Sequence, residues 1–465
     1  MEVLIVIIAL AFLVVMAYRG FSVIIFAPLA ALGAVLLTDP SAVVPAYTGI
    51  FLEKMVIFIK LYFPVFLLGA IFGKVIELSG NAKSISSAVI RMVGQQRAML
   101  VIVLVCALLT YGGVSLNVVV FAVYPFAAEM FRLGNIPKRL IPGTIALGAF
   151  TFTMDSLPGS PQVQNIIPTT FFKTGTWAAP WLGTLGGLFI FILGMLYLES
   201  RRRAAARAQE GYGINHINEP AAIDKNEKLP HPMWALFPLV LVCSLNYVLG
   251  KWIPVWYDLA QYSLNLPGLS APLAVDVVKS APIWGVEGAL LIGIVTVIIS
   301  SWRTVLPKFS EGSKNAVNGA MLAAMNSASE FGFGAVVASL PGFVIAAKAL
   351  ESVPNPLVNE AVAITGLAAM TGSAIGGLSI ALGAMGDTFI TAAHAAHIPL
   401  EVFHRIAAMA SGGMDTLPHN GAVITLLTVT GLTHRQSYKD IFAITIIKSI
   451  ACAFAIVLFY TTGIV

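Results

Sequence analysis

The sequence predicts an all-α polytopic membrane protein built from two inverted repeats, each with a re-entrant helical hairpin and a broken transmembrane helix. Three observations lead to this fold class. The 465 residues are 58% hydrophobic and only 11% charged, whereas soluble domains contain about 45–50% apolar and roughly 25% charged residues. Long apolar runs alternate with basic clusters. Two apolar segments are interrupted by proline, glycine and aspartate, and these interruptions share a motif.

The clearest spans are long runs of apolar residues, since a helix that crosses a bilayer needs about 20 of them. We expect the first run to be retained as a span, because no basic residue precedes it and no clear small-residue cleavage site follows it. The cysteines lie in apolar runs without CxxC spacing, which indicates buried thiols and no disulfide or metal framework. The runs are 3–17, 21–38, 182–198, 288–300 and 441–465, and the cysteines are Cys106, Cys243 and Cys452.

Basic residues set the predicted orientation, because Lys and Arg concentrate in cytoplasmic loops. The net charge of +5 has this origin, so it does not indicate a nucleic-acid partner. The clusters place the N- and C-termini outside the cytoplasm, and the loop 251–282 is expected to be external. We divide the chain into an N-terminal transmembrane repeat (1–200), a polar cytoplasmic linker (201–232) and a C-terminal inverted transmembrane repeat (233–465).

Two segments are expected to be hairpins that dip into the membrane. Segment 98–131 begins and ends near basic clusters, and its centre, TYGGVSLN (110–117), is rich in glycine and polar groups. Each arm has only about 14 residues, which is short for a full crossing, although two complete crossings are the alternative. The second hairpin, 356–397, is expected to open to the outside. Segments 140–172 and 401–432 follow the hairpins and are the expected broken helices.

Recurrent motifs indicate a duplicated unit. MDSLP at 154–158 matches MDTLP at 414–418, with an offset of 260 residues. GGVS at 112–115 matches GGLS at 376–379, with an offset of 264 residues. The matches keep their order, and the two copies are expected to face opposite ways. Inverted repeats with broken helices are typical of secondary transporters, although channels also use re-entrant segments.

The broken segments carry the groups that a solute site needs. An unwound helix exposes N–H groups at the start of one half-helix and C=O groups at the end of the other, which attract anions and cations respectively. Pro158 and Pro418 prevent regular hydrogen bonding, and Gly159 and Gly421 permit unusual dihedral angles. The candidate substrate- and ion-binding residues are Ser115, Asn117, Asp155, Ser156, Ser160, Gln162, Asn165, Ser373, Ser379, Asp415, Thr416, His419 and Asn420.

Ionisable residues in the apolar segments are candidates for proton coupling, because such residues are costly in a membrane and usually functional. Asp155 and Asp415 occupy matching positions, and both direct ion coupling and structural capping of a half-helix are open. His419 has no ionisable counterpart in the first copy. It is a candidate proton-responsive or anion-contacting group, with a structural histidine as the alternative. Glu330 and Asp387 are further candidates for which a structural role is equally open.

Four stretches carry a family resemblance: TYGGVSLNVVVFAVYP (110–125), MDSLPGSPQVQN (154–165), GGLSIALGAMGDTF (376–389) and MDTLPHNGAVITLL (414–427). With them the whole chain resembles the gluconate permease family of the ion transporter superfamily. The resemblance implies proton-coupled symport of a small carboxylate, such as gluconate, a related sugar acid or 3-hydroxybutyrate, across the bacterial inner membrane. The hairpin tips depart from the Ser-Asn-Thr triplets of that superfamily, which puts sodium coupling in doubt.

A proton:carboxylate symporter that works by alternating access is therefore the leading interpretation. A sodium-coupled transporter of the same architecture and an anion channel are the alternatives. An enzyme is not expected, because the sequence has no nucleotide-hydrolysis loop, no HExxH motif and no region large enough for a catalytic domain. The expected partners are a small anionic substrate, a coupling proton, the lipid bilayer and a second copy of the chain in a homodimer. No cofactor or metal is expected.

Overall fold

The computed structural model describes residues 1–19, 21–93, 97–114, 116–214, 216–219, 229–257, 261–268, 271–345, 353–371, 373–418 and 420–465. Its N-terminal half contains α1 (Glu2–Tyr18), α2 (Val23–Thr38), α3 (Val43–Ala46), α4 (Glu53–Leu78), α5 (Asn81–Val93), α6 (Ala98–Tyr111), α7 (Leu116–Leu133), α8 (Ile141–Ala149), α9 (Phe152–Asp155), α10 (Val163–Phe172) and α11 (Pro180–Arg207).

The C-terminal half contains α12 (Pro232–Tyr257), α13 (Val277–Ser300), α14 (Trp302–Ala338), α16 (Pro356–Thr371), α17 (Ala374–Ala395), α18 (Leu400–Gly412), α19 (Gly421–Thr430) and α20 (His434–Thr462). Six helical stretches among the described residues are long and apolar enough to cross a membrane. They are Pro40–Leu78, Pro180–Arg207, Pro232–Tyr257, Ser280–Ser300, Ala374–Ala395 and His434–Thr462. The predicted all-α, multi-pass membrane protein is confirmed.

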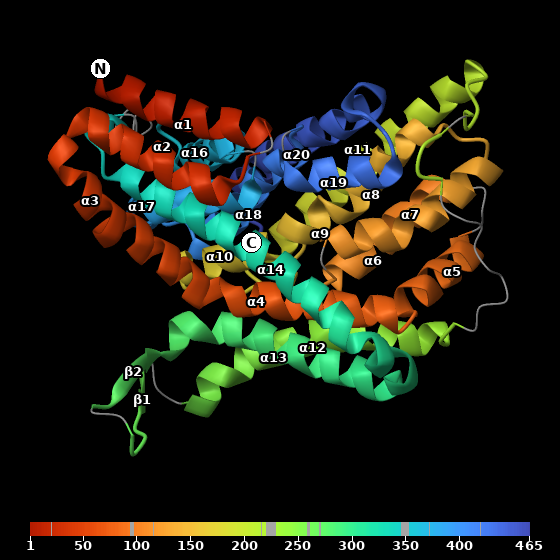
Figure 1. The fold of residues 1–465 in the computed structure, drawn as a ribbon, viewed down its shortest axis with the longest axis horizontal. Helices are drawn as coiled ribbons and strands as arrows, with labels where there is room; N and C mark the ends of the chain where they lie inside the picture. Colours follow the sequence, from red (N-terminus) through yellow and green to blue (C-terminus); the bar gives the residue numbers. More distant parts are fainter. Residues whose placement is uncertain are drawn as a thin grey trace.

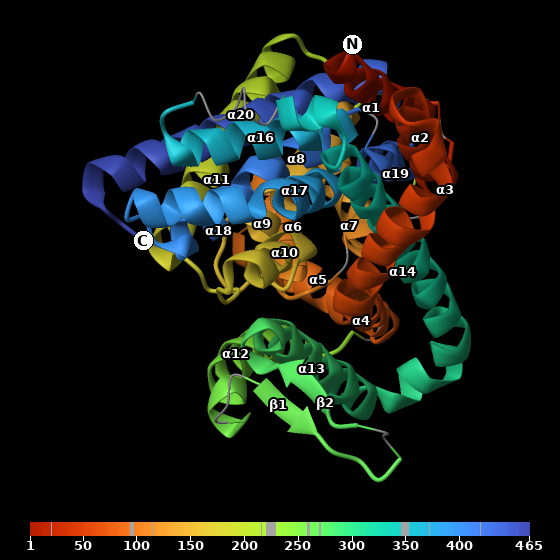
Figure 2. The ribbon, with the colours of Figure 1, turned by 90° about the vertical axis from the view of Figure 1, so that its left-hand side faces the viewer.

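The helices are arranged in layers around a buried centre. Figures 1 and 2 both place α12 and α13 in an outer layer, and α4 lies between that layer and the centre of the molecule. The long helix α14 packs along α4 and reaches α2 and α17. Every residue of α8 is buried, and so is nearly all of α18. Because these two helices are the first halves of the interrupted segments, the interruptions lie in the core rather than at the lipid-facing surface.

Both predicted hairpins are present as helix–turn–helix units. The first consists of α6 and α7, and the second consists of α16 and α17. At 1.5 Å per residue, the 14 residues of α6 span about 21 Å and the 16 residues of α16 about 24 Å. Both first arms fall below the roughly 30 Å of a hydrocarbon core, whereas the 22 residues of α17 reach about 33 Å. Their depth in a bilayer stays a prediction, as does the inverted relation of the two halves.

Both predicted broken helices are interrupted where the prolines and glycines lie. In the first, α8 ends at Ala149, the single turn α9 follows, and the chain is non-helical until α10 begins at Val163. Gly159 adopts a φ of 75° within this stretch, a conformation that favours glycine. In the second, α18 leads into a 3₁₀ turn at Gly413–Thr416, and α19 begins at Gly421.

Two regions differ from the sequence-based expectation. The predicted external loop contains a small antiparallel hairpin, β1 (Gln261–Leu264) with β2 (Leu273–Asp276), so the fold is not purely helical. Its strands carry Tyr262 and Val275, residues that favour strands. The start of the predicted linker is also helical, because α11 continues to Arg207. Glu199 pairs there with Arg202 and Arg203 one turn later, at 2.6 and 3.1 Å, and such pairs stabilise a helix end.

The rest of the described linker is bound to the protein surface. Asn218 donates its Nδ2 to the Thr428 carbonyl on α19 at 2.9 Å, and its own carbonyl accepts from the Tyr124 hydroxyl on α7 at 2.7 Å. The buried Lys138 donates to the Ile217 carbonyl at 2.8 Å and pairs with Glu219 at 2.8 Å. The linker therefore joins the first hairpin to the second broken helix.

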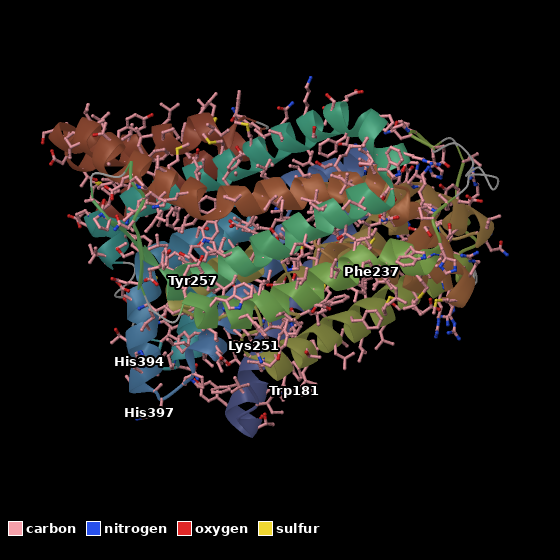
Figure 3. The ribbon with its side chains drawn as sticks, turned by 90° about the horizontal axis from the view of Figure 1, so that it is seen from below. Trp181, Phe237, Lys251, Tyr257, His394 and His397 are labelled. Carbon is pink, nitrogen blue, oxygen red and sulfur yellow. The ribbon has the colours of Figure 1, made fainter. Side chains whose placement is uncertain are left out.

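The opposite end of the molecule carries the β hairpin. Figure 3 shows Tyr257, at the end of α12, on the same side of the molecule as His394 and His397, whereas Phe237 lies towards the other end. His394 lies in the last turn of α17 and His397 follows that helix, so the second hairpin opens at the end where the β hairpin lies. This placement fits the expected grouping of these segments on one side of the membrane.

Candidate substrate and ion site

The two interruptions meet at the centre of the protein. Gly412, the last residue of α18, lies directly against the Asp155 carboxyl, and a Cβ at this position would overlap it. Gln164, from the first interrupted helix, donates its Nε2 to Asp415 in the second at 2.8 Å. Residues about 250 positions apart in the sequence are therefore in direct contact. Asp155 and Asp415, one from each half, thus belong to the same buried cluster.

Asp155 forms a buried ion pair with Lys448 of α20. The Lys448 Nζ lies 3.0 Å from Asp155 Oδ2, and both side chains are 1% exposed. The ammonium also donates to the carbonyls of Phe150, at 2.7 Å, and of Gly412. The two carbonyls therefore use two of the three ammonium donors, and Asp155 Oδ2 is held as an ion-pair partner. Ser156 donates its hydroxyl to the other oxygen of Asp155 at 2.7 Å.

The Lys448 ammonium sits where two half-helices end. Phe150 follows the last residue of α8, and Gly412 is the last residue of α18. Carbonyls at a helix C-terminus lack intrahelical partners and carry a partial negative charge. One cation therefore satisfies both ends and pairs with an acid that the same interruption supplies. This arrangement explains how irregular backbone persists in the core of a membrane protein.

A second buried cation, Arg405 of α18, holds the first interruption in place. Its guanidinium donates to the Ala178 carbonyl at 2.7 and 3.2 Å, to the Asp155 carbonyl at 3.2 Å and to Asn165 Oδ1 at 2.9 Å. The neighbouring His404 contacts the Thr174 hydroxyl at 2.6 Å. Since these partners are mainly neutral, Arg405 contributes positive charge to the centre of the protein.

The tip of each hairpin contacts the interruption in its own half. In the first half, the Tyr111 hydroxyl donates to the Pro158 carbonyl at 2.7 Å, and Gln162 Nε2 donates to the Thr110 carbonyl at 2.7 Å. In the second half, Asp415 Oδ1 accepts from the backbone N–H of Ala374, the first residue of α17, at 3.0 Å. A movement of either hairpin would therefore act directly on the site.

The remaining predicted residues support this geometry. Ser160 donates to the Thr153 carbonyl at 2.6 Å, and Asn165 Nδ2 donates to the Ser160 carbonyl at 2.9 Å. The Thr416 hydroxyl lies 2.6 Å from that of Thr445. Asn420 caps α19 by accepting from Ala422 N at 2.8 Å, and Ser373 caps α17 by accepting from Gly376 N at 3.0 Å.

Glu330 joins the second half of the site. It is 5% exposed, and the Ser373 hydroxyl hydrogen-bonds to its carboxyl group. Its Oε2 atom has no partner and lies against Gly376, where no Cβ would fit. Glu330, Ser373 and Asp415 thus surround the tip of the second hairpin. Asp387 does not join them, because it lies on an exposed face of α17, more than three turns beyond the tip.

Three predicted residues cannot be placed. Ser115 and His419 lie outside the described residues, and for Asn117 only its place in α7 is described. Their proposed roles stay predictions.

A cavity of about 230 Å³ lies beside the site, between α4, α10, α14 and α17. It carries four polar side chains on a mainly apolar wall. Tyr62 donates its hydroxyl to Thr170 at 3.1 Å, whereas the buried Ser379 hydroxyl has no partner. Lys54 supplies a positive charge. The lining residues are Lys54, Ile57, Leu61, Tyr62, Thr170, Phe171, Phe331, Ala335, Ser379, Ile380 and Gly383.

Several ionisable residues at the site were not predicted from the sequence. Lys448, Arg405 and His404 belong to the central cluster, and Glu360 is fully buried in α16. The signal that could have found them is an isolated ionisable residue in an apolar segment, which applies to cations as much as to acids. Lys448 stands alone in the run ITIIKSIACAFAIV.

Charged residues outside the membrane-spanning segments have pKa values set by their partners. Hydrogen bonds from Arg139 lower the pKa of Glu210 from its usual value. Burial opposes ionisation of Glu219, but hydrogen bonds from Lys138 and Tyr212 outweigh it and lower the pKa of this carboxyl. Both acids are therefore ionised at neutral pH and hold the linker to the protein.

The sequence matches no family model. A protein of Bacillus subtilis (strain 168), named uncharacterized transporter YxjC, is 55% identical over 474 residues, and the alignment covers 100% of both chains. The chain belongs to the family of this transporter. It is therefore a membrane transporter and not an enzyme, as the sequence predicts. The crystal structure of the YdaH transporter from Alcanivorax borkumensis, described as having an unusual topology, aligns with a TM-score of 0.48 and 17% identity over 92% of this chain and 90% of that one.

Proposed function

We propose that the protein is a secondary active transporter that carries a small organic carboxylate together with a proton by alternating access. The observation that supports this most directly is the contact between the two interrupted helices around the Asp155–Lys448 pair. Transporters place substrate and coupling-ion sites where discontinuous helices meet. The resemblance to gluconate permeases favours a carboxylate, with gluconate, related sugar acids and 3-hydroxybutyrate as candidates.

The ion pair suggests how proton and substrate are coupled. In the structure, the Asp155 carboxylate neutralises Lys448. When Asp155 takes up a proton, the Lys448 charge becomes available to a substrate carboxylate. One proton and one monocarboxylate then enter together, and the net charge of the buried cluster does not change. Because burying an uncompensated charge is costly, the empty and the fully loaded forms can change conformation more readily than a half-loaded form.

We propose that the substrate enters through the cavity between α4, α10, α14 and α17. Lys54 would attract an anion, and the hydroxyl groups of Tyr62, Thr170 and Ser379 would replace part of its water shell. Polar side chains inside a membrane protein usually mark such solute pathways. The unpartnered hydroxyl of Ser379 is the group most ready to bind an incoming acid.

Uptake into vesicles tests the proposal. The purified protein would be reconstituted, and radiolabelled 3-hydroxybutyrate or gluconate would be supplied under an inward pH gradient without sodium. Accumulation above equilibrium supports proton-coupled transport of that acid. A strict sodium requirement would favour the sodium-coupled alternative, and equilibration without accumulation would favour the channel. A panel of unlabelled acids as competitors would identify the preferred substrate.

Two substitutions connect the activity to the site. Asp155→Asn imitates the protonated acid and leaves Lys448 available, so we expect exchange of substrate across the membrane to persist while accumulation driven by the pH gradient is lost. Asp415→Asn should impair transport more mildly, because the amide oxygen can still accept from Ala374. Full accumulation in both variants would remove the two acids from the mechanism.

We also propose that the protein resides in the bacterial inner membrane as a homodimer, with both termini outside the cytoplasm. Labelling of cysteines introduced near each terminus with a membrane-impermeant reagent tests the orientation, and the mass of the purified protein in detergent tests the dimer.

A further inference from the structure

The helix α16 contains an acid that neither the central ion pair nor the cavity uses. Glu360 is 0% exposed, and neither of its carboxyl oxygens has a hydrogen-bond partner among the residues that the structure describes. No salt bridge among the described residues involves it. An unpaired carboxylate buried in an apolar environment is among the most costly groups in a protein, whereas the neutral acid is tolerated.

The surroundings of Glu360 are nearly free of charge. Helices α1, α17, α18 and α20 and the Gly413–Thr416 turn pack against α16. The titratable side chain that lies within electrostatic range of Glu360 is Cys452 of α20. None of the other titratable groups on these elements forms a described ion pair or hydrogen bond with it: Glu2, Asp387, His394, Glu401, His404, Arg405, Asp415, His434, Arg435, Tyr438, Lys439, Asp440, Lys448 and Tyr460.

Cys452 also connects Glu360 with the central site. It follows Lys448 by four residues, so the two side chains lie on the same face of α20, one turn apart. The thiol lies within electrostatic range of Asp155 as well as of Glu360. Cys452 is therefore the side chain of α20 that is electrostatically close to both acids.

Glu360 is separate from the tip of its own hairpin. It lies five residues into the helix-forming segment that begins at Pro356, and Ser373 at the tip is 13 residues further on, about 20 Å along a helix. Thr365, between the two, donates its hydroxyl to the Ala410 carbonyl at 3.0 Å, just before Gly412 and its contact with Asp155. The base of the hairpin and the central ion pair thus belong to one packed unit.

We infer that Glu360 is a second proton-binding site, which loads a proton at the base of the second hairpin and supplies it to Asp155. The inference rests on the proposed proton coupling. In the transfer, the Glu360 O–H bond breaks, an Asp155 O–H bond forms, and the resulting Glu360 carboxylate takes up a replacement proton from water at the end of α16.

Transport measurements on Glu360→Gln test the inference. The glutamine keeps the shape of the neutral acid but cannot give up a proton. We expect at least a tenfold loss in the rate of pH-driven accumulation of labelled 3-hydroxybutyrate or gluconate, whichever the wild type carries, with an unchanged rate and KM for exchange of the same acid. Glu401→Gln, an exposed acid at the start of α18, is the matched control and should match the wild type.

Wild-type accumulation in Glu360→Gln, or an equal loss of accumulation and exchange in a folded variant, would overturn the inference. Infrared spectroscopy provides a second measurement that needs no transport. The wild type at neutral pH should show the C=O stretch of a protonated carboxylic acid, and this band should weaken in Glu360→Gln but not in Glu401→Gln. Absence of the band in the wild type overturns the inference even where the variant fails to fold. If the wild type accumulates neither 3-hydroxybutyrate nor gluconate, the proposed function fails. The infrared result still decides whether the Glu360 carboxyl is protonated.

Discussion

Replacing Lys448 with methionine isolates the contribution of the central ion pair. The substitution keeps an unbranched side chain, one atom shorter, but removes the charge and three donors. Asp155 would then be a buried carboxylate without a cation, and the carbonyls of Phe150 and Gly412 would lose their partner. Breaking a buried pair by removing one member costs about 3–5 kcal/mol. Each unsatisfied carbonyl adds about 1–3 kcal/mol.

The double variant Lys448→Met, Asp155→Asn separates these contributions. It removes the unpaired Asp155 carboxylate, and the two carbonyls remain the only groups without a partner. We therefore expect its free energy of unfolding to exceed that of Lys448→Met alone by about 2–4 kcal/mol. The assay is unfolding of the purified protein in detergent, analysed as a double-mutant cycle with both single variants. Both Lys448 variants should lose uptake. If the double variant is no more stable than Lys448→Met, or if Lys448→Met alone retains wild-type stability, the description of Lys448 as the cation that neutralises the site is wrong.

Three further predictions concern the contact between the interruptions, the cavity and the linker. Gly412→Ala should abolish uptake and lower the melting temperature, because the new methyl group overlaps the Asp155 carboxyl, whereas Gly421→Ala meets no atom within 4 Å and should keep both. Ala335→Leu should raise the KM for uptake at least several-fold by filling the cavity, and Ala323→Leu, on an exposed face of the same helix, should leave it unchanged; equal KM values would place the substrate route elsewhere. Because the folded-state pKa of Glu219 is lowered, its stabilising contribution is present above its unfolded pKa of about 4.3 and is lost as the pH falls through the lower folded value. Glu219→Gln should therefore reduce the stability difference between pH 7 and pH 3, measured by melting temperature, and Glu401→Gln should not.

The sequence predicts the interruptions well because their cause is local. Pro158, Gly159 and Pro418 lie in the two non-helical stretches, where the motifs place them. Proline alone is not sufficient, because Pro125 and Pro168 lie inside α7 and α10. The hairpins follow from the same local information. The motif GGVS at 112–115 falls between α6 and α7, at the tip of the first hairpin, whereas its match GGLS at 376–379 lies inside α17, so the second tip was predicted a few residues too late.

The partners within the site were not predictable in this way. Asp155 pairs with Lys448 because of how α20 packs across the centre of the protein. The two residues are 293 positions apart in the sequence, so no local pattern predicts the pair. Asp387 illustrates the opposite case, because its motif lies close to the tip in sequence but the helical rotation of α17 directs it to an exposed face. The β hairpin was missed because its strands are only four residues long and lie in a segment that composition marks as a loop.

The bound linker changes how the connection between the two halves is understood. A linker without contacts to the protein would limit the separation of the two halves only through its length. Here Asn218 joins a hairpin arm to a half-helix of the other repeat through two backbone carbonyls, and Lys138 secures the neighbouring residues. If one half moves against the other, this peptide must either move with one of them or lose these hydrogen bonds. Opening at this end of the protein therefore has to break contacts rather than only extend a free linker.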